Sequence, residues 1–205
     1  MSDWIGNKNS IYKTIGASNH TDKEREENDY YATDPIAIDK LIAVDSPHFA
    51  VWECACGEGH LSERLKDYGC TVFSSDIIDR GYREQNAVVD FLAVTETCPF
   101  DGYCDIVTNP PYKYAKEFVK KSLELIKHGR KVYMLLKLTF CEGKARYKEI
   151  FSTTPPKKIY VFSERLLCAK NAKFEEMQQS GGSAVCYAWF VWEKGYKGKT
   201  ILEWI

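Results

Sequence analysis

The sequence contains no apolar run of the roughly 20 residues that a membrane-spanning helix needs, and residues 1–12 lack the apolar core of a signal peptide. We therefore expect a cytoplasmic protein with no membrane partner. Its four histidines do not cluster with Ser, Cys or Asp in a triad-like order, so a histidine-based nucleophilic site is not indicated. Internal repeats, low-complexity tracts and an interdomain linker are also missing, which favours a single domain.

Residues with the spacing of metal ligands are scarce. Although the chain has eight cysteines, only Cys54 and Cys56 lie close together, and no second pair or His cluster completes a zinc site. Most of the other cysteines stand singly in apolar or strand-like stretches, where buried reduced thiols are common. The sequence therefore predicts no structural metal and no disulfide framework.

The composition is that of a globular protein: 205 residues, 44% hydrophobic and 28% charged, are enough for one packed domain. The net charge of −1 conceals a segregation along the chain. Residues 1–112 hold 9 Lys and Arg against 20 Asp and Glu, whereas residues 113–173 hold 16 against 5. This asymmetry favours a surface that faces a polyanion, although solvated helix faces would give the same pattern.

The order of the predicted elements indicates an α/β fold. Residues 1–28 are polar and end in a charged run, so we expect a flexible or ligand-ordered arm before a domain at 29–205. Apolar strand-like runs then alternate with amphipathic helices, which is typical of a mostly parallel sheet. We predict strands at 50–54, 70–75, 86–89, 105–108, 131–136, 158–162 and 185–192, and helices at 35–42, 61–68, 114–127 and 144–151. The seventh and last strand is expected to be antiparallel and to lie at the sheet edge.

The first predicted strand ends at Glu53 and Cys54 and is followed by Gly57 and Gly59 at the start of a helix. Glycine lets the backbone adopt positive φ and approach a ligand closely, although a purely structural turn would also use it. The next strand ends at Asp76, 19 residues after Gly57, where an acidic side chain can accept hydrogen bonds from both hydroxyls of a ribose. A helix cap is the alternative for Asp76.

Two further strand ends carry candidate side chains. After the third strand, the carboxylate of Asp90 can accept a hydrogen bond from an adenine amino group and Phe91 can flank the ring, although Asp90 can equally be a cap. After the fourth strand comes Asn109-Pro110-Pro111-Tyr112. Two prolines can neither continue a strand ladder nor enter a helix interior, so they fix a rigid loop at the carboxyl edge of the sheet.

At these residues the chain resembles the amino-methyltransferases, most of all small phage-type DNA adenine-N6 methyltransferases. The resemblance covers about residues 29–192, and Tyr30 to Pro35 is similar to the family's Tyr-x-Thr-Pro segment, with Asp34 inserted. It implies a single Rossmann-like domain that binds S-adenosylmethionine. The implied cofactor-binding residues are Tyr31, Thr33, Pro35, Glu53, Cys54, Gly57, Gly59, Asp76, Ile77, Asp90, Phe91 and Asn109. The implied catalytic residues are Asn109, Pro110, Pro111 and Tyr112.

The chemistry of these residue types agrees with that resemblance. An aromatic amine delocalises its lone pair into the ring and is a poor nucleophile until it is rehybridised. The Asn109 side-chain oxygen and the Pro110 carbonyl can each accept one N–H of the amine and direct its lone pair at a methyl donor. Tyr112 can stack on a base that has been flipped out of a duplex.

Two stretches, 138–156 and 163–183, mix cations with aromatic residues and are expected to face the substrate, unless they are ordinary surface connections. Expected nucleic-acid contacts are Lys113, Arg146, Arg165, Lys170 and Lys173. DNA is the expected partner. Cytosine-N4, RNA or a protein glutamine would be alternative acceptors, and a non-catalytic binding module or a dehydrogenase-like dinucleotide protein is a further alternative. The dinucleotide alternative is disfavoured because Ser62 stands where the third glycine of G-x-G-x-x-G would be.

Overall fold

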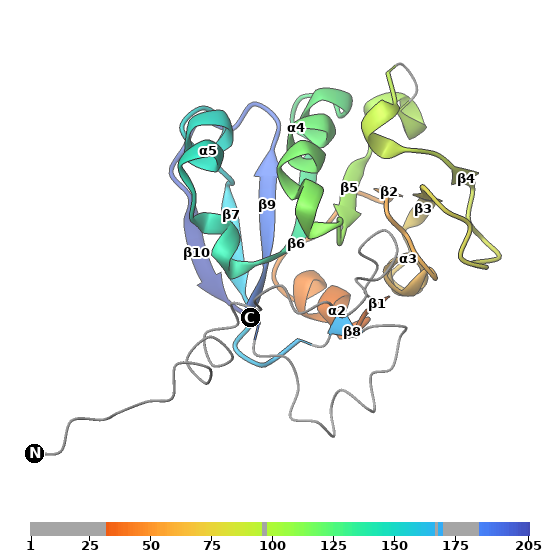
Figure 1. The fold of residues 1–205 in the computed structure, drawn as a ribbon. Coiled ribbons are helices and arrows are strands. Elements are labelled where there is room, and N and C mark those ends of the chain that lie inside the picture. The colour runs from red at the N-terminus through yellow and green to blue at the C-terminus, as the bar shows by residue number, and fades with distance from the viewer. Residues whose placement is uncertain (1–31, 96–97, 167, 170–184) are drawn as a thin grey trace, which may run out of the picture.

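The structure, a computed structural model, describes residues 32–95, 98–166, 168–169 and 185–205. An eight-stranded sheet with the order β10-β7-β9-β6-β5-β2-β3-β4 forms its centre (Figure 1). Its strands are β2 (Ala50–Glu53), β3 (Thr71–Asp76), β4 (Ala87–Val88), β5 (Asp105–Thr108), β6 (Lys131–Lys137), β7 (Lys158–Val161), β9 (Tyr187–Glu193) and β10 (Ile201–Trp204). Only β9 runs antiparallel to its neighbours, β6 and β7. The expected Rossmann-like α/β fold is thus confirmed.

Two details of the predicted sheet were wrong. The sheet has eight strands rather than seven, because the short segment Ile201–Trp204 pairs in parallel with β7. The antiparallel strand β9 lies inside the sheet, between β6 and β7, rather than at its edge. Six consecutive β9 residues, 187–192, are buried, and a strand that is apolar on both faces needs a layer of structure on each side.

Helices cover both faces of the sheet. On one face α2 (Ile36–Ile42) and α3 (His60–Asp67) pack their apolar residues against alternate residues of the central strands. On the other face lie α4 (Ala115–Leu125), α5 (Lys144–Arg146) and the π-helical turn at Tyr147–Phe151 that continues α5. In α4 the buried side chains recur at helical spacing, which is why this segment forms a helix along the sheet: Ala115, Phe118, Val119 and Ser122.

A second, two-stranded sheet joins distant parts of the chain. The strand β1 (Ala32–Thr33) pairs antiparallel with β8 (Cys168–Ala169), so that Thr33 faces Cys168 in the register. Neither strand was predicted, because two residues carry no readable periodicity. This small sheet brings the segment before α2 beside the segment after β7.

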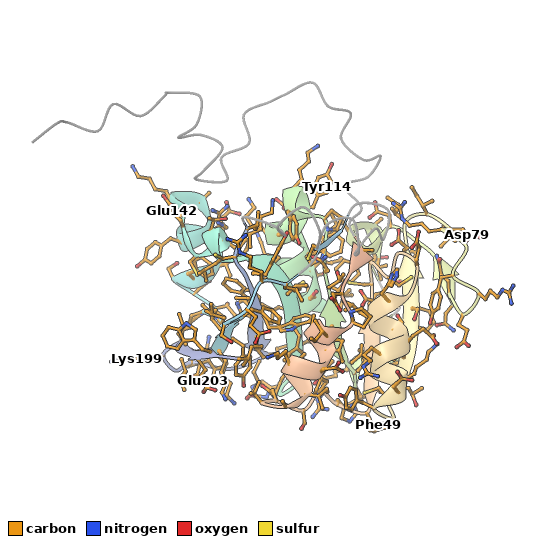
Figure 2. All side chains as sticks on the ribbon, turned by 90° about the horizontal axis from the view of Figure 1, so that it is seen from below. Phe49, Asp79, Tyr114, Glu142, Lys199 and Glu203 are labelled. Carbon is orange, nitrogen blue, oxygen red and sulfur yellow. The ribbon has the colours of Figure 1, made fainter. Side chains whose placement is uncertain are left out.

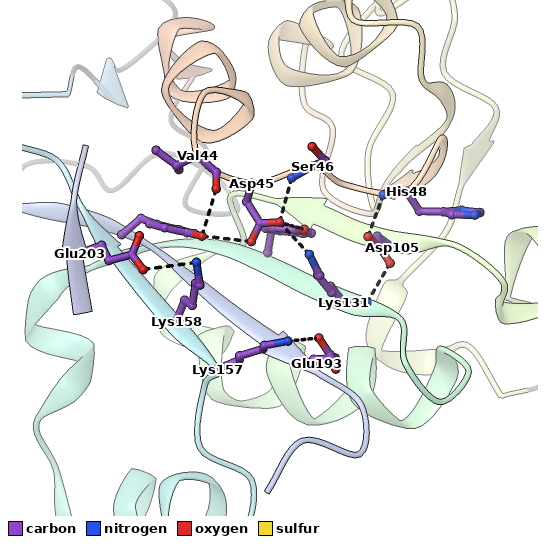
Figure 3. Close-up of polar contacts among 12 residues, drawn as sticks. Val44, Asp45, Ser46, His48, Asp105, Lys131, Lys157, Lys158, Glu193 and Glu203 are labelled. Carbon is purple, nitrogen blue, oxygen red and sulfur yellow. Dashed lines mark hydrogen bonds and ion pairs between the residues drawn. The ribbon is translucent and has the colours of Figure 1, made fainter. Parts of the chain in front are cut away.

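At the amino-terminal ends of the strands, a polar network fixes the chain where it enters the sheet (Figure 3). Asp45 accepts hydrogen bonds from Lys131 Nζ at 2.6 Å and from the Tyr160 hydroxyl at 3.2 Å. Burial acts to raise the pKa of Asp45, but the hydrogen bond and charge of Lys131 hold it below its usual value. Asp105 accepts hydrogen bonds from the backbone N–H groups of His48 and Lys131, both at 2.8 Å. These polar groups form hydrogen bonds with one another, so a functional site is expected at the opposite end of the sheet.

Candidate active site

A cavity of about 370 Å³ lies at the carboxyl ends of β2, β3 and β5. The chain runs outward from β2 through β3 to β4 and then returns to β5 on the other side, and such a reversal leaves a crevice between the two central strands. Tyr114 of the cavity wall lies at the end of the molecule that carries Asp79 and Glu142, opposite Phe49 (Figure 2). The cavity is lined by eleven of the predicted residues: Thr33, Glu53, Cys54, Asp76, Ile77, Asp90, Phe91, Asn109, Pro110, Pro111 and Tyr112.

Glu53, the last residue of β2, is a buried carboxyl group in the cavity wall with 1% of its surface exposed. Neither of its oxygens has a hydrogen-bonding partner of good geometry among the described residues. Burial raises the pKa of Glu53 to about 8, against a weaker lowering by the nearby Thr108 hydroxyl and Ala55 N–H. A charge partner supplied by a ligand would satisfy this group.

The glycine turn after β2 is built around Asp76. The Asp76 side chain accepts hydrogen bonds from the Gly57 N–H at 2.9 Å and from the Ile78 N–H at 3.1 Å. Gly59 has φ of 87°, and a Cβ atom there would collide with the Tyr82 ring. Glycine is therefore required at position 59 because the Tyr82 ring leaves no room for a side chain. Three of the expected cofactor residues, Gly57, Gly59 and Pro35, are not among the residues that line the cavity.

Asp90 and Phe91 form the wall next to β2. The Asp90 carboxylate caps the short helix that follows by accepting a hydrogen bond from the Leu92 N–H at 2.9 Å. Phe91 is buried edge-on against Trp52, with ring centroids 5.1 Å apart. The cap that the sequence left open for Asp90 is thus present, and the same side chain also borders the cavity.

Asn109 directly follows β5, and the two polar atoms of its side-chain amide have different surroundings. Its Nδ2 atom donates a hydrogen bond of 2.8 Å to the Thr33 hydroxyl. Its Oδ1 atom is buried and has no hydrogen-bonding partner in the described part of the chain. A buried acceptor without a donor is rare in folded proteins, and this one lies in a cavity wall.

Tyr112 lines the cavity, and its ring is also in contact with two neighbouring side chains. Its ring packs at a tilt on Tyr187, with centroids 6.0 Å apart, and Lys137 Nζ lies over it at 4.7 Å from the centroid. Burial raises the pKa of the Tyr112 phenol well above its usual value. Neither Tyr187 nor Lys137 lines the cavity, so the aromatic side chain is positioned from behind.

Sequence reasoning missed several residues that line the cavity: Ala32, Ala55, Cys56, His60, Leu61, Arg80, Leu92, Tyr114 and Phe118. Tyr114 and Phe118 follow the Asn-Pro-Pro-Tyr loop and face it from the start of α4, so their position after the motif was a usable signal. Arg80 had none, because it reaches the cavity only through the irregular loop after β3.

Three of the residues expected to contact nucleic acid lie in the described part of the chain: Lys113, Arg146 and Arg165. Lys113 is exposed beside the cavity, with Nζ 5.0 Å from the centroid of the Tyr114 ring. Arg165 is exposed, and Arg146 donates hydrogen bonds to the carbonyls of Phe140 and Glu142. Lys170, Lys173 and the expected cofactor residue Tyr31 lie outside the described residues.

Acidic groups neutralise part of the basic segment 113–173. Six of its lysines form ion pairs with carboxylates: Lys116, Lys120, Lys121, Lys131, Lys157 and Lys158. Three of the acidic partners, Asp45, Glu193 and Glu203, come from outside the segment. Charge counted along the sequence therefore overstates the positive charge that faces solvent.

Neither a metal-ligand cluster nor a membrane span is found in the described part of the chain. Within residues 32–95, 98–166, 168–169 and 185–205, no three His, Cys, Asp or Glu side chains gather as a metal site. All eight cysteines are free thiols, although Cys98 and Cys104 approach to 3.9 Å between their sulfur atoms. None of the helices in these ranges has the length and apolar character to span a membrane.

The strand order, the crevice where that order reverses and the cavity in this crevice together define the class of fold. Comparison with solved structures then narrows this class. A candidate class I S-adenosylmethionine-dependent methyltransferase from Listeria monocytogenes is 13% identical with a TM-score of 0.57, over 97% of this chain and 72% of that one. A candidate RNA methyltransferase from Pyrococcus horikoshii is 12% identical with a TM-score of 0.55, over 92% and 99%. The 23S rRNA methyltransferase ErmE is 19% identical with a TM-score of 0.53, over 82% and 72%.

The sequence identities are low, and the TM-scores establish a shared fold alone. No protein-family model and no curated protein sequence matches the chain. The protein thus has the fold of the class I methyltransferases, and its function depends on the residues of its own cavity.

Proposed function

We propose that the protein transfers a methyl group from S-adenosylmethionine to the exocyclic N6 amine of adenine in DNA. The observation that carries the proposal is Asn109 Oδ1, a buried acceptor in the cavity wall that has no hydrogen-bonding partner among the residues that the structure describes. It is followed by Pro110, Pro111 and Tyr112 on a loop that ends a central strand. An amine entering this cavity would supply the missing donor.

The residues of the cavity suit the proposed cofactor. S-adenosylmethionine supplies a methyl group on a positively charged sulfur, together with an ammonium group, a ribose and an adenine. Glu53 offers a buried carboxyl group that has no hydrogen-bonding partner of good geometry in the described ranges, and a cationic ligand would stabilise its ionised form. Asp76 and Asp90 offer carboxylate oxygens at two neighbouring strand ends, while Phe91 and Leu92 offer apolar contact for a ring.

The acceptor side of the cavity suits an aromatic amine. Asn109 Oδ1 and the Pro110 carbonyl would each accept one N–H of the amine, which favours a tetrahedral nitrogen with its lone pair free to attack. Tyr112 and Tyr114 add aromatic surface on which a flipped base can stack. Lys113 places a positive charge beside the Tyr114 ring of the cavity wall, where it could contact a phosphate of the bound substrate.

RNA is the second candidate substrate, because the solved structures with this fold include a candidate RNA methyltransferase and a 23S rRNA methyltransferase. The chemistry at Asn109 would be the same. A cytosine amine would also present an N–H pair to this loop, and we rank it below adenine because the loop begins with Asn. A protein glutamine amide would present the same pair of N–H groups.

The test is methyl transfer from labelled S-adenosylmethionine to DNA, RNA and protein, followed by nucleoside analysis. We expect label in N6-methyladenine from DNA. Asn109→Ala should lower the transfer rate by a factor on the order of 10²–10³, the typical effect of removing one preorganised partner of the reacting group. Its affinity for the cofactor should stay within about threefold, since Oδ1 acts on the acceptor. A folded Asn109→Ala protein with the parent rate would remove this loop from the acceptor site.

A further inference from the structure

We propose that Cys98 and Cys104 form a thiol-modification site, which a low-molecular-weight disulfide such as oxidised glutathione converts reversibly into an intramolecular disulfide. The inference does not rest on the proposed function, because both cysteines precede β5 and Cys104 lies at the end of the sheet opposite the cavity. Asp105, the first residue of β5, directly follows Cys104. The reaction therefore joins the segment before this strand covalently to the start of the strand.

The two sulfur atoms are already neighbours. Cys98 Sγ and Cys104 Sγ are 3.9 Å apart, and both residues are free thiols in the structure. The sulfur atoms of a disulfide are about 2.0 Å apart, so they must approach each other by about another 2 Å. A rotation about the Cα–Cβ bond of one cysteine moves its sulfur atom by a comparable distance.

A left-handed turn brings the two cysteines together. Phe100 and Asp101 have φ of 57° and 53°, and Gly102 follows with 78°. The Tyr103 N–H closes the turn by donating a hydrogen bond of 2.9 Å to the Phe100 carbonyl. Left-handed backbone is unfavourable for residues with a Cβ atom, and two of them in succession are uncommon. Such conformations cluster at functional sites, and here the turn places one thiol beside the other.

The two thiols differ in their access to solvent, as an attacking and a resolving thiol do. Cys98 is partly exposed, whereas Cys104 has no exposed surface. A dissolved disulfide therefore reaches Cys98 first. Cys104 is protected from direct reaction with the oxidant, and its sulfur lies beside the product that forms at Cys98.

The surroundings of Cys98 favour its thiolate, which is the form that attacks disulfides. The hydrogen bond with Cys104 lowers the pKa of Cys98, although burial acts to raise it. The Gly102 N–H and the positive charge of Lys127 also lower this pKa, and their effect does not depend on which of the two thiols donates to the other. Lys127 is fixed at the turn, because its backbone N–H donates a hydrogen bond of 2.9 Å to the Gly102 carbonyl.

The reaction consists of two thiol–disulfide exchanges. The Cys98 thiolate attacks one sulfur of oxidised glutathione, forms a mixed disulfide and releases one glutathione thiolate. Cys104 then loses its proton, attacks the Cys98 sulfur and releases the second glutathione thiolate. Each released thiolate takes up one of the protons that the cysteines gave up. Two protein thiols are thereby oxidised to one disulfide, and one glutathione disulfide is reduced to two thiols.

The experiment incubates the folded protein with oxidised glutathione, blocks the remaining thiols with N-ethylmaleimide and maps the cysteines by mass spectrometry. Chymotrypsin cleaves after Phe100 and Tyr103, so that only a disulfide keeps the peptides of Cys98 and Cys104 together. We expect this linked pair in the parent protein, and we expect dithiothreitol to separate it. Cys104→Ala should instead keep a glutathione adduct at Cys98, because the resolving thiol is missing.

The contribution of Lys127 is tested with Lys127→Gln. Its matched control is Lys120→Gln, because Lys120 lies on α4 and forms an ion pair with Glu149. Loss of the charge at Lys127 should slow the disappearance of the Cys98 thiol by about two- to fivefold, and Lys120→Gln should leave this rate at the parent value. An unchanged rate in Lys127→Gln would contradict the activation of Cys98 by that charge.

Two results on the parent protein would overturn the inference. One is a Cys98 that remains a glutathione adduct, since Cys104 would then not resolve it. The other is a Cys98 thiol that stays unmodified while the exposed Cys141 reacts, since Cys98 would then not be the attacking thiol. Both results are read without any variant, so poor folding of Cys104→Ala does not remove the test. Methyl transfer is measured separately, and its absence would leave the assignment of this thiol pair intact.

Discussion

Replacing Glu53 with glutamine should stabilise the free protein and weaken its binding of S-adenosylmethionine. Glutamine has nearly the shape of a protonated glutamate and carries no ionisable proton. In the free protein, the Glu53 carboxyl group is buried without a good hydrogen-bonding partner among the described residues, and its pKa is raised from 4.5 to about 8. The unfolded chain ionises this group near its usual pKa, so folding must either take up a proton or bury a charge.

The sign and size of the effect follow from the two pKa values. Below the unfolded pKa of 4.5 both states are protonated, and Glu53 has no effect on the free energy of unfolding. As the pH rises from there to about 8, the unfolded state gives up its proton first and stability is lost progressively. At about 1.4 kcal/mol per pKa unit, the full loss is on the order of 4–5 kcal/mol. Glu53→Gln should recover it.

The assay is urea unfolding followed by tryptophan fluorescence between pH 5.5 and 8.5, for the parent protein, Glu53→Gln and the matched control Glu124→Gln. Glu124 is exposed and pairs only loosely with Lys121, so its change should alter stability by less than about 1 kcal/mol at every pH. For Glu53→Gln the stability gain over the parent should grow steadily with pH. A gain that is absent, or independent of pH, would refute the argument that Glu53 is protonated in the free protein.

The same residue predicts a proton change on binding. If a cationic cofactor stabilises the ionised form of Glu53, binding at pH 7 releases a proton to the buffer. The calorimetric binding enthalpy of the parent protein should therefore differ between phosphate and Tris, whose ionisation enthalpies differ, and the difference should vanish in Glu53→Gln. The affinity of that variant should fall by about 10- to 100-fold, as expected for a lost bond to a charged group.

The other predictions concern three further residues. Asp76→Ala should lose both cofactor affinity and about 2–4 kcal/mol of stability, because it leaves the Gly57 and Ile78 N–H groups without an acceptor; calorimetry and urea unfolding measure the two effects, and an unchanged stability would contradict the structural part. Tyr112→Ala should weaken both DNA binding and turnover, whereas Tyr112→Phe should keep most turnover because the ring face carries the proposed contact; equal losses in the two would assign the role to the phenol. Lys113→Gln should lower DNA affinity and reduce its salt dependence by about one phosphate contact, and an unaltered salt slope would place Lys113 outside the interface.

The sequence determined much of the fold because strong local patterns agree with it. Seven of the eight central strands were predicted within one or two residues at each end. This was possible because short apolar runs that alternate with amphipathic helices are typical of the strands of an α/β domain. The same order of elements puts Glu53, Asp76 and Asn109 at the carboxyl ends of neighbouring strands. Parallel strands share that edge, so residues far apart in sequence could be assigned to one cavity.

Only the tertiary structure determined which groups contact the residues of the cavity. The pairing of β1 with β8 joins two-residue segments 135 positions apart in register, Thr33 and Cys168, and no local pattern encodes it. It brings the Thr33 hydroxyl to Asn109, just as packing brings the Tyr82 ring to Gly59. Burial likewise distinguishes Glu53 from the other acidic residues of the cavity, because its raised pKa results from the removal of its carboxyl group from water, which only the fold brings about.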